Sequence, residues 1–204
     1  MKIAVIGAGS VGATLGGGWV DAGYDVIFGV REPESEKYQA LPAPRATPAE
    51  AAAQADVILL ATPWPATEAA IGSLGPLSGK LVLDATNPLK PQLAGLTHGH
   101  ETSGGELVAQ WAAGARVVKI FNTTGFDNMA NPHYPDGAAT MLYCGDDSEA
   151  KAVAHALAQA LGFEPQDAGP LTQARLLEPF ALLWISLAYQ QGLGRDFAFR
   201  LVRR

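Results

Sequence analysis

The stretch MKIAVIGAGSVG, residues 1 to 12, decides the fold of this chain. A short apolar run, Lys2–Ile6, is followed at once by glycines in the spacing G-x-G-x-x-G. The apolar run predicts a buried strand, and the segment Ala13–Ala22 predicts a helix that ends at Gly23. The N-terminus therefore predicts a strand, a tight glycine turn and a helix, in that order.

Each glycine of this turn is expected to have its own task. Gly7 permits the tight turn, Gly9 lets the backbone approach a pyrophosphate, and Gly12 lets the helix pack closely on the strand. Free N–H groups at the helix start then face the anion, aided by the helix dipole. After a strand and before a helix, the motif predicts dinucleotide binding, and the alternative is a glycine-rich turn without a ligand. The candidate cofactor-binding residues here are Gly7, Ala8, Gly9, Ser10, Val11 and Gly12.

Apolar runs and helical segments alternate along the rest of the chain. The runs are nearly continuous in Val, Ile and Leu, which is typical of strands buried on both faces of a parallel sheet. This order predicts an α/β fold with a doubly wound, Rossmann-type parallel sheet. The further expected strands are Asp25–Phe28, Asp56–Ala61, Lys80–Asp84, Arg116–Phe121 and Met141–Cys144. The further expected helices are Pro48–Ala55 with Thr47 as its cap, Gly104–Ala112, and Glu149–Leu161 with Ser148 as its cap.

After Gly162 the pattern changes to a short C-terminal extension. A long helix is expected from Leu171 to Gln191, and its apolar positions nearly encircle it, which indicates burial within the fold or against another subunit. Pro179 is expected to bend or interrupt this helix. We therefore expect a dinucleotide-binding Rossmann domain, residues 1–162, and a small helical region, residues 163–204, for dimerisation or the substrate cleft.

Composition excludes several classes of protein. The 204 residues suit one domain with a small addition, and 48% hydrophobic with 17% charged residues lies in the globular range. A net charge of −6 argues against a nucleic-acid partner. The longest apolar stretch, around Phe180 to Tyr189, is too short for the ~20 residues of a bilayer-spanning helix. The only cysteine, Cys144, excludes an internal disulfide and fits a reducing cytosol, so we expect a cytoplasmic protein with no membrane partner.

The end of the second strand predicts which dinucleotide binds. An NAD site usually places Asp or Glu there to hold the ribose 2′-OH, and such a carboxylate would repel a 2′-phosphate. Here the tip reads Gly29-Val30-Arg31, and the planar guanidinium of Arg31 can grip a phosphate. We predict NADP(H) over NAD(H), with Ser35 as an additional donor. The alternative for Arg31 is a solvated side chain paired with Glu32 or Glu34.

Ligands of an open α/β sheet lie at the carboxyl ends of its strands. Three exits read ATPWP (61–65), DATNP (84–88) and FNTTGF (121–126), which offer hydroxyls, amides and an aromatic with few charges. Such a lining suits the uncharged carboxamide of nicotinamide and a flat ring beside it. Trp64 either forms part of this wall or is a half-buried packing residue. The candidate residues here are Thr62, Pro63, Trp64, Asn87, Pro88, Asn122 and Thr123.

No side chain is assigned a catalytic role. The sequence has no G-x-S-x-G motif and no Cys–His pairing. His98 and His100 beside Glu101 could form a metal pair, but without further ligands we interpret them as a solvated turn and predict no metal site. Asp84 fits a structural role as well as a place in the crevice. Hydride transfer between two planar rings needs mainly positioning, which suits a chain with only about 40 residues after Gly162.

The chain resembles the NADP oxidoreductases that depend on the deazaflavin coenzyme F420. The matching pieces are MKIAVIGAGSVG, the Gly29-Val30-Arg31 tip, DVILLATPW, LVLDATNP, the Cys144–Asp147 turn and, most specific, DAGPLTQARLLEP from Asp167 to Pro179. The resemblance implies a small, often dimeric C-terminal helical part. It also implies that NADP lies along Ala8–Gly12, at Val30 and Arg31, near Ser35, and past Pro63-Trp64, Asn87 and Thr123. The implied reaction is reversible hydride exchange between nicotinamide C4 and the deazaflavin ring.

Two departures bear on the hydride acceptor. Family members often have Ser where this chain has Val30, and FNTTGF looks more like bacterial relatives and the cytosolic domains of ferric reductases that pass hydride from NADPH to a flavin. The leading hypothesis is an NADPH-dependent reductase, acting as a homodimer on a small-molecule co-substrate that is coenzyme F420 or a flavin (FMN or FAD). Two alternatives stay open: a reductase of a small carbonyl or imine substrate, and a non-catalytic NADP-binding sensor.

Overall fold

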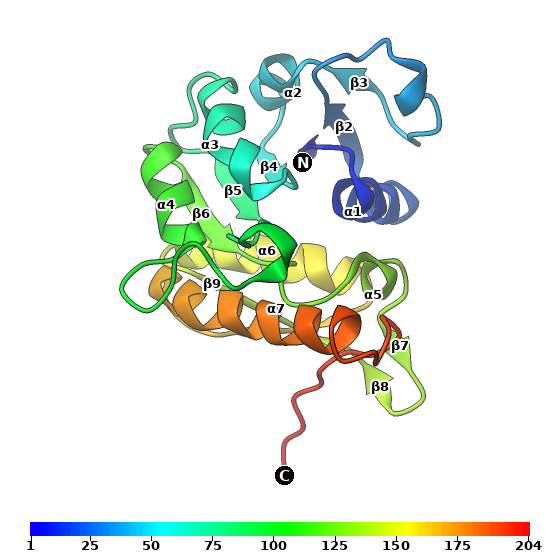
Figure 1. Ribbon diagram of the computed structural model, residues 1–204. Coiled ribbons are helices and arrows are strands. Elements are labelled where there is room, and N and C mark those ends of the chain that lie inside the picture. Colours follow the sequence, from blue (N-terminus) through cyan, green and yellow to red (C-terminus); the bar gives the residue numbers. More distant parts are fainter.

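The computed structural model describes residues 1–204, and ten strands and seven α-helices make up the fold (Figure 1). The strands are β1 Lys2–Ile6, β2 Asp25–Gly29, β3 Arg45–Ala46, β4 Val57–Leu60, β5 Leu81–Asp84, β6 Arg116–Lys119, β7 His133–Tyr134, β8 Gly137–Ala138, β9 Thr140–Gly145 and β10 Glu164–Asp167. The α-helices are α1 Ser10–Asp21, α2 Pro48–Gln54, α3 Trp64–Gly72, α4 Gly104–Trp111, α5 Phe126–Ala130, α6 Ser148–Ala160 and α7 Ala174–Tyr189.

Eight of the strands form one sheet in the order β10-β9-β6-β5-β4-β1-β2-β3, and β7 and β8 pair separately. All neighbours in the large sheet run parallel except β6 and β9, which are antiparallel. The predicted doubly wound α/β fold is therefore confirmed, with one antiparallel pair in the sheet. The segment after Gly162 also contributes β10 to this sheet before the C-terminal helix begins.

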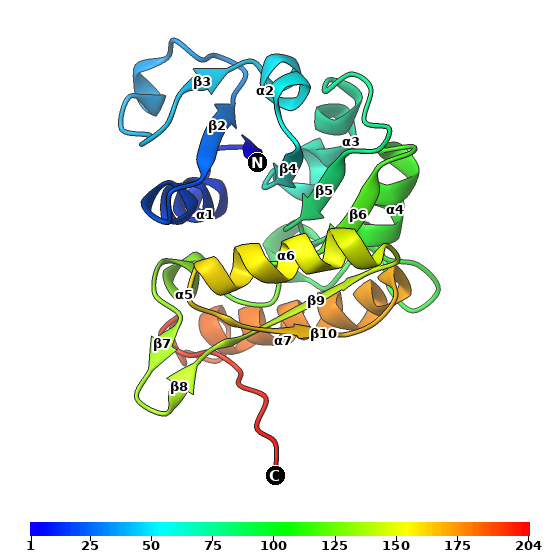
Figure 2. The ribbon, with the colours of Figure 1, turned by 180° about the vertical axis from the view of Figure 1, so that it is seen from behind.

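The strands are buried on both faces, as their continuous apolar runs predict. In β1, Ile3 and Val5 pack in the cluster that contains residues of α1 and α6. The alternate residues Ala4 and Ile6 pack in a second cluster with residues of α2, α3, α4 and α7. Helices on both faces follow from this alternation, because successive side chains of a strand point to opposite sides. α7 lies in front of β9 in Figure 1, and α6 lies in front of it in the reverse view of Figure 2.

The helix starts follow local side-chain signals. Thr47 caps α2 as predicted: its hydroxyl accepts from the Glu50 N–H at 3.4 Å, and the Glu50 carboxylate accepts from the Thr47 N–H at 3.0 Å. The prediction that Ser148 caps α6 is wrong. Asp147 is the cap, and its carboxylate accepts from the Ala150 N–H at 2.7 Å. Both residue types are good N-caps, and the stronger carboxylate acceptor one position earlier takes the role.

The C-terminal helix differs from its expected form in two ways. It begins as a 3-10 turn at Leu171–Gln173, and α7 then runs through Pro179, so of the expected bend or interruption the interruption is wrong. The ring lies in the second turn, where the burial of Leu177 and Glu178 next to it keeps the helix docked. Leu177, Ala181 and Trp184 face the core, whereas Leu176 and Leu183 are 65% and 50% exposed. No helix of the structure combines the length and apolar character that a bilayer crossing needs.

The position of β1 fixes where a ligand can bind. β1 stands between β2 and β4, so the chain leaves it in one direction towards β3 and returns on its other side through β4, β5 and β6. In doubly wound sheets, a crevice forms at such a switch point, outside the carboxyl ends of the strands. The glycine turn and the exits of β4 and β5 meet at this edge.

Candidate functional site

The glycine turn is packed tightly on the sheet side and open on the other. Gly7 has a φ of +101°, and a Cβ there would lie 2.6 Å from the Ala61 carbonyl oxygen. A Cβ on Gly12 would collide with the carbonyl oxygen of Gly7. A Cβ on Gly9 would meet nothing within 4 Å. The fold itself thus requires glycine at positions 7 and 12, whereas Gly9 leaves a free cradle at the N-terminus of α1, of the kind that a pyrophosphate occupies.

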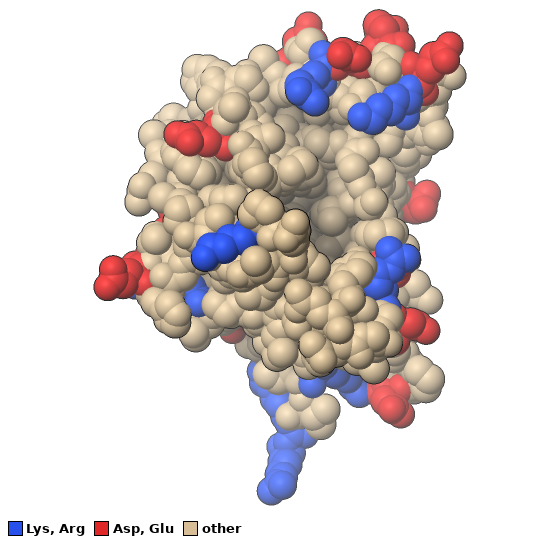
Figure 3. Space-filling view, viewed as in Figure 1, with Lys and Arg blue, Asp and Glu red and all other residues tan.

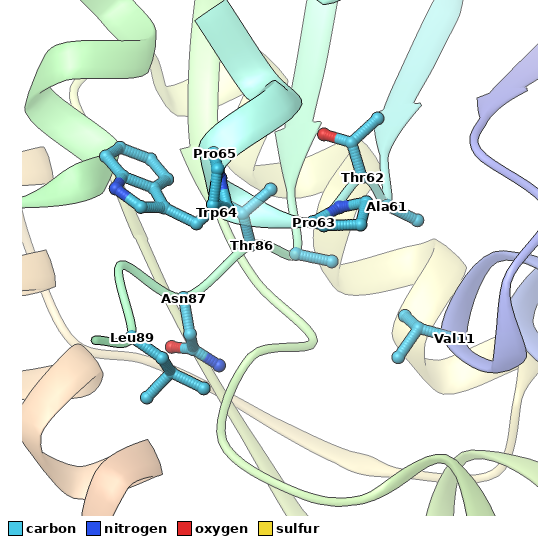
Figure 4. Close-up of a pocket in the computed structure, with 10 residues that line it drawn as sticks. Val11, Ala61, Thr62, Pro63, Trp64, Pro65, Thr86, Asn87 and Leu89 are labelled. Atoms are coloured by element: carbon cyan, nitrogen blue, oxygen red, sulfur yellow. The ribbon is translucent and has the colours of Figure 1, made fainter. Parts of the chain in front are cut away.

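A pocket of about 330 Å³ lies beside this cradle, at the exits of β4 and β5. Figure 4 shows Thr86 and Asn87 on one side of it and Val11, at the start of α1, on the other. Figure 3 shows a hollow in the middle of the face seen in Figure 1, lined by uncharged residues. The lining residues are Val11, Ala61, Thr62, Pro63, Trp64, Pro65, Ala85, Thr86, Asn87 and Leu89, none of which is titratable.

The pocket contains five of the residues singled out from the sequence. They are Val11, Thr62, Pro63, Trp64 and Asn87. Ser35, Pro88, Asn122 and Thr123 are not part of its lining. Thr86 and Leu89 also line the pocket, although they were not among the residues predicted from the sequence. The signal for Thr86 was present, because it stands in the same strand exit as Asn87 and carries the hydroxyl that such a site favours.

Trp64 fills both roles that the sequence left open. It is the first residue of α3 and lines the pocket. It is also half-buried, packing against Trp111 at a ring-centroid distance of 5.3 Å and edge-on against His98 at 5.7 Å. These two neighbours hold the indole at the pocket wall.

Two asparagines join the exits of β5 and β6. The Asn122 side-chain amide donates to the Asn87 side-chain carbonyl at 3.1 Å, and the Asn87 amide donates to the backbone carbonyl of Asn122 at 2.9 Å. The Asn122 Oδ1 atom is buried and has no hydrogen-bond partner. A buried acceptor left unpaired is costly, and Asn122 itself does not line the pocket, so its amide group serves to hold Asn87 at the pocket wall.

The exit of β6 is bent by an unusual residue. Phe121 is fully buried and has a φ of +64°, a left-handed conformation that costs a bulky residue about 1–3 kcal/mol. Its ring packs on Trp19 and Phe163, at centroid distances of 5.7 and 6.4 Å. This packing holds the turn that brings Asn122 opposite Asn87.

The tip of β2 carries one free cationic side chain. Arg31 is exposed and takes part in none of the ion pairs of the structure, so its pairing with Glu32 or Glu34 is not observed. Val30 is buried, and its N–H donates to the Ala46 carbonyl at 2.9 Å. Ser35 lies on the same loop and is half-buried. The Arg31 guanidinium is therefore free of carboxylate partners at this strand tip.

No nucleophile or metal cluster lies at the crevice. Cys144 is fully buried, and burial raises the pKa of its thiol to about 12, so the thiol stays protonated. Asp84 has a structural role: its Oδ1 atom accepts from the N–H of Thr86 at 2.9 Å and from the Thr86 hydroxyl at 2.7 Å. No group of three or more His, Cys, Asp or Glu residues is placed to hold a metal ion.

A glycine turn at a switch point, beside an uncharged pocket, defines a dinucleotide-binding protein of the Rossmann class. Residues 2–88 match the family described as NADP oxidoreductase, coenzyme F420-dependent. The F420-dependent NADP reductase of Methanothermobacter marburgensis is 31% identical over 92% of this chain and 92% of its own length. The chain belongs to this family, and it is an NADP-dependent oxidoreductase.

Two further relatives are similar over most of the chain. The crystal structure of a protein from Arthrobacter sp. FB24, assigned provisionally as an F420-dependent NADP reductase, superposes with a TM-score of 0.89 and 32% identity over 100% of both chains. The metalloreductase STEAP3 of Rattus norvegicus is 29% identical over 89% of this chain. The match spans only 36% of STEAP3, so most of that protein has no counterpart here.

Proposed function

We propose that this protein transfers a hydride between NADPH and a deazaflavin or flavin. The observation that carries the proposal is the pocket lining, which has apolar, hydroxyl and amide groups but no titratable side chain. A reaction that needs a positioned acid or base would lack its residue there, whereas transfer between two stacked rings needs mainly alignment. The full-length relationship to F420-dependent NADP reductases supports the same acceptor class.

NADP would be held at three places along the crevice. The N–H groups from Ala8 to Gly12 would receive the pyrophosphate, because the open side of Gly9 gives room for its approach. Arg31, with Ser35 on the same loop, would receive the 2′-phosphate. Thr86 and Asn87, whose hydroxyl and amide groups line the pocket, would face the carboxamide of the nicotinamide. Bound NADPH supplies the hydride, and the protein supplies orientation and a dry wall.

The wall at the nicotinamide end would be built from Trp64, Pro63 and Thr62 together with Thr86 and Asn87, across from Val11. The indole and the prolines exclude water from one side of the pocket, while the hydroxyl and amide groups fix orientation. A flat acceptor ring would lie against this wall. Its proton, where one is needed, would come from solvent, because the lining holds no acid.

We also propose that residues 1–162 form the NADP-binding unit and that residues 163–204 carry the dimer contact. Large apolar side chains are exposed along and just after α7: Leu176, Leu183, Tyr189 and Leu193. A second copy of the chain would bury this face. Sedimentation velocity at micromolar concentration is expected to show a dimer, and Leu183→Glu is expected to shift it to monomer. A monomeric wild-type protein would contradict this contact.

Acceptor choice tests the proposed reaction. Under anaerobic conditions, NADPH absorbance is expected to fall with oxidised coenzyme F420, FMN or FAD, and to stay constant with small cyclic imines and ketones. The reason is that the pocket offers a flat wall but no acid to protonate a carbonyl or imine.

Two outcomes would contradict the proposal, and each has its own meaning. Turnover with imines or ketones alone would indicate a reductase of small substrates. Tight NADPH binding with no turnover on any acceptor would indicate a nucleotide-binding sensor.

A further inference from the structure

Three charged side chains meet in the core beneath the pocket. The Lys119 ammonium lies 2.9 Å from the Asp84 carboxylate and 2.8 Å from the Glu178 carboxylate, and it donates to the Thr86 carbonyl at 2.7 Å. Lys119 and Asp84 are 0% exposed and Glu178 is 1% exposed. All three ammonium donors are therefore used, and one of them binds the backbone of a pocket residue.

The Glu178 carboxylate is also bound by the N-terminus of α4. Its two carboxylate oxygens accept from the N–H groups of Gly104 and Gly105, at 2.8 and 2.9 Å. These are the first two residues of α4, where the helix dipole and free donors favour an anion. The carboxylate thus joins α7, α4 and, through Lys119, the exit of β5.

The cluster keeps its charges inside the core. Burial by itself would lower the pKa of Lys119, but the attraction of Asp84 and Glu178 outweighs burial and raises the pKa above the ordinary lysine value. Buried ion clusters contribute little net stability compared with apolar residues of similar volume, and they fix geometry in some proteins. The geometry fixed here includes Thr86, which the Asp84 carboxylate holds from its other side.

A second connection runs in parallel from the neighbouring residue of α7. The Leu177 carbonyl accepts from the Asn122 side-chain amide at 3.3 Å, and the same amide reaches Asn87. Glu178 therefore connects to Thr86 through Lys119, and Leu177 connects to Asn87 through Asn122. Both end points line the pocket.

We propose that Glu178 is a positioning residue. Through Lys119, it holds the exit of β5 in the geometry that aligns the nicotinamide end of the cofactor. This inference rests on the proposed function, because it assigns the nicotinamide to the pocket at Thr86 and Asn87. The C-terminal extension then contributes to the nucleotide site from within the subunit, besides carrying the proposed dimer contact.

Glu178→Gln tests the proposal with binding as the first readout. The change keeps the side-chain size, removes the charge and places an amide N–H against ammonium or backbone donors. We compare the affinity for NADP⁺ with the affinity for adenosine 2′,5′-bisphosphate, which lacks the nicotinamide half and depends on the glycine turn and Arg31. The ratio of the first affinity to the second is expected to fall roughly tenfold, because only NADP⁺ uses the nicotinamide end of the site. The kcat/KM for NADPH is expected to fall by at least a similar factor, because the misplaced nicotinamide also transfers its hydride more slowly.

Glu106→Gln is the matched control. Glu106 and Arg175 form an ion pair between the same two helices, at 2.6 Å, but do not reach the pocket. This variant is expected to keep the wild-type affinity ratio and kcat, whatever it does to the melting temperature. If Glu178→Gln does not fold, Gly105→Ala replaces it, since its added methyl would lie 3.1 Å from Ala174 Cβ and α4 and α7 must then shift by a few tenths of an ångström beside the Glu178 contact.

The outcomes separate this inference from the proposed function. Wild-type protein that binds NADP⁺ but reduces no acceptor would overturn the proposed reaction, and the affinity ratio of Glu178→Gln would still decide the positioning role. An affinity ratio in Glu178→Gln equal to that of Glu106→Gln would overturn the positioning role, with wild-type turnover left intact. In the replacement variant Gly105→Ala, a selective loss of NADP⁺ affinity supports the proposal and a wild-type ratio overturns it.

Discussion

Replacing Arg31 with alanine is expected to weaken NADPH binding by roughly 10- to 150-fold and to leave NADH binding almost unchanged. Arg31 is exposed at the tip of β2 and has no carboxylate partner, so its guanidinium is free to bind the 2′-phosphate. NADH carries an uncharged hydroxyl at that position, so the loss of the Arg31 cation changes its binding affinity little. Isothermal titration calorimetry with both nucleotides measures the two effects separately.

Lys37→Ala controls for the general loss of positive charge on the same loop. Lys37 stands over the Tyr38 ring at 4.9 Å rather than at the strand tip, so its removal is expected to affect both nucleotides little. Equal losses for NADPH and NADH in Arg31→Ala would show that the arginine does not read the 2′-phosphate.

Gly9→Ala is expected to weaken the binding of both NADPH and NADH by about 100-fold while leaving the fold intact. Gly9 has a φ of −77° and a ψ of −173°, which alanine can adopt, and its Cβ would meet no protein atom within 4 Å. The added methyl would stand where the pyrophosphate must approach the backbone. Its stability cost is expected to be about 1 kcal/mol, because glycine is a better N-cap than alanine.

Gly72→Ala supplies the matched control for the methyl group. Gly72 also has open space around its missing Cβ, but it ends α3, away from the turn. NADPH affinity is expected to be unchanged in this variant. If Gly9→Ala bound NADPH with full affinity, the assignment of the pyrophosphate to the glycine turn would be wrong, because the added methyl could not be accommodated beside a bound phosphate.

Much of the fold and part of the site could be predicted from local sequence. The continuous apolar runs indicated buried strands, and the glycine spacing after Ile6 indicated the turn, because only glycine tolerates the contacts found at positions 7 and 12. Strand exits carrying Thr62 and Asn87 indicated the pocket, because the carboxyl ends of parallel strands share one edge.

The remaining features depend on contacts between distant residues. Glu178 stands among apolar residues of a helix, and nothing near it in sequence marks the Gly104 N–H, 74 residues away, as its partner. The antiparallel direction of β9 likewise leaves no trace in its composition, since apolar strands look alike in either direction. The unpaired Oδ1 atom of Asn122 becomes visible only when its neighbours are in place.

We propose that one crevice aligns NADPH with a flat acceptor ring for direct hydride transfer. A single turnover of NADPH deuterated at C4 with oxidised coenzyme F420 tests this alignment. Direct transfer predicts that the label from one face of C4 is recovered in the reduced deazaflavin and that the reaction slows with deuterium. Label recovered in water, or no reaction although NADPH binds tightly, would contradict it.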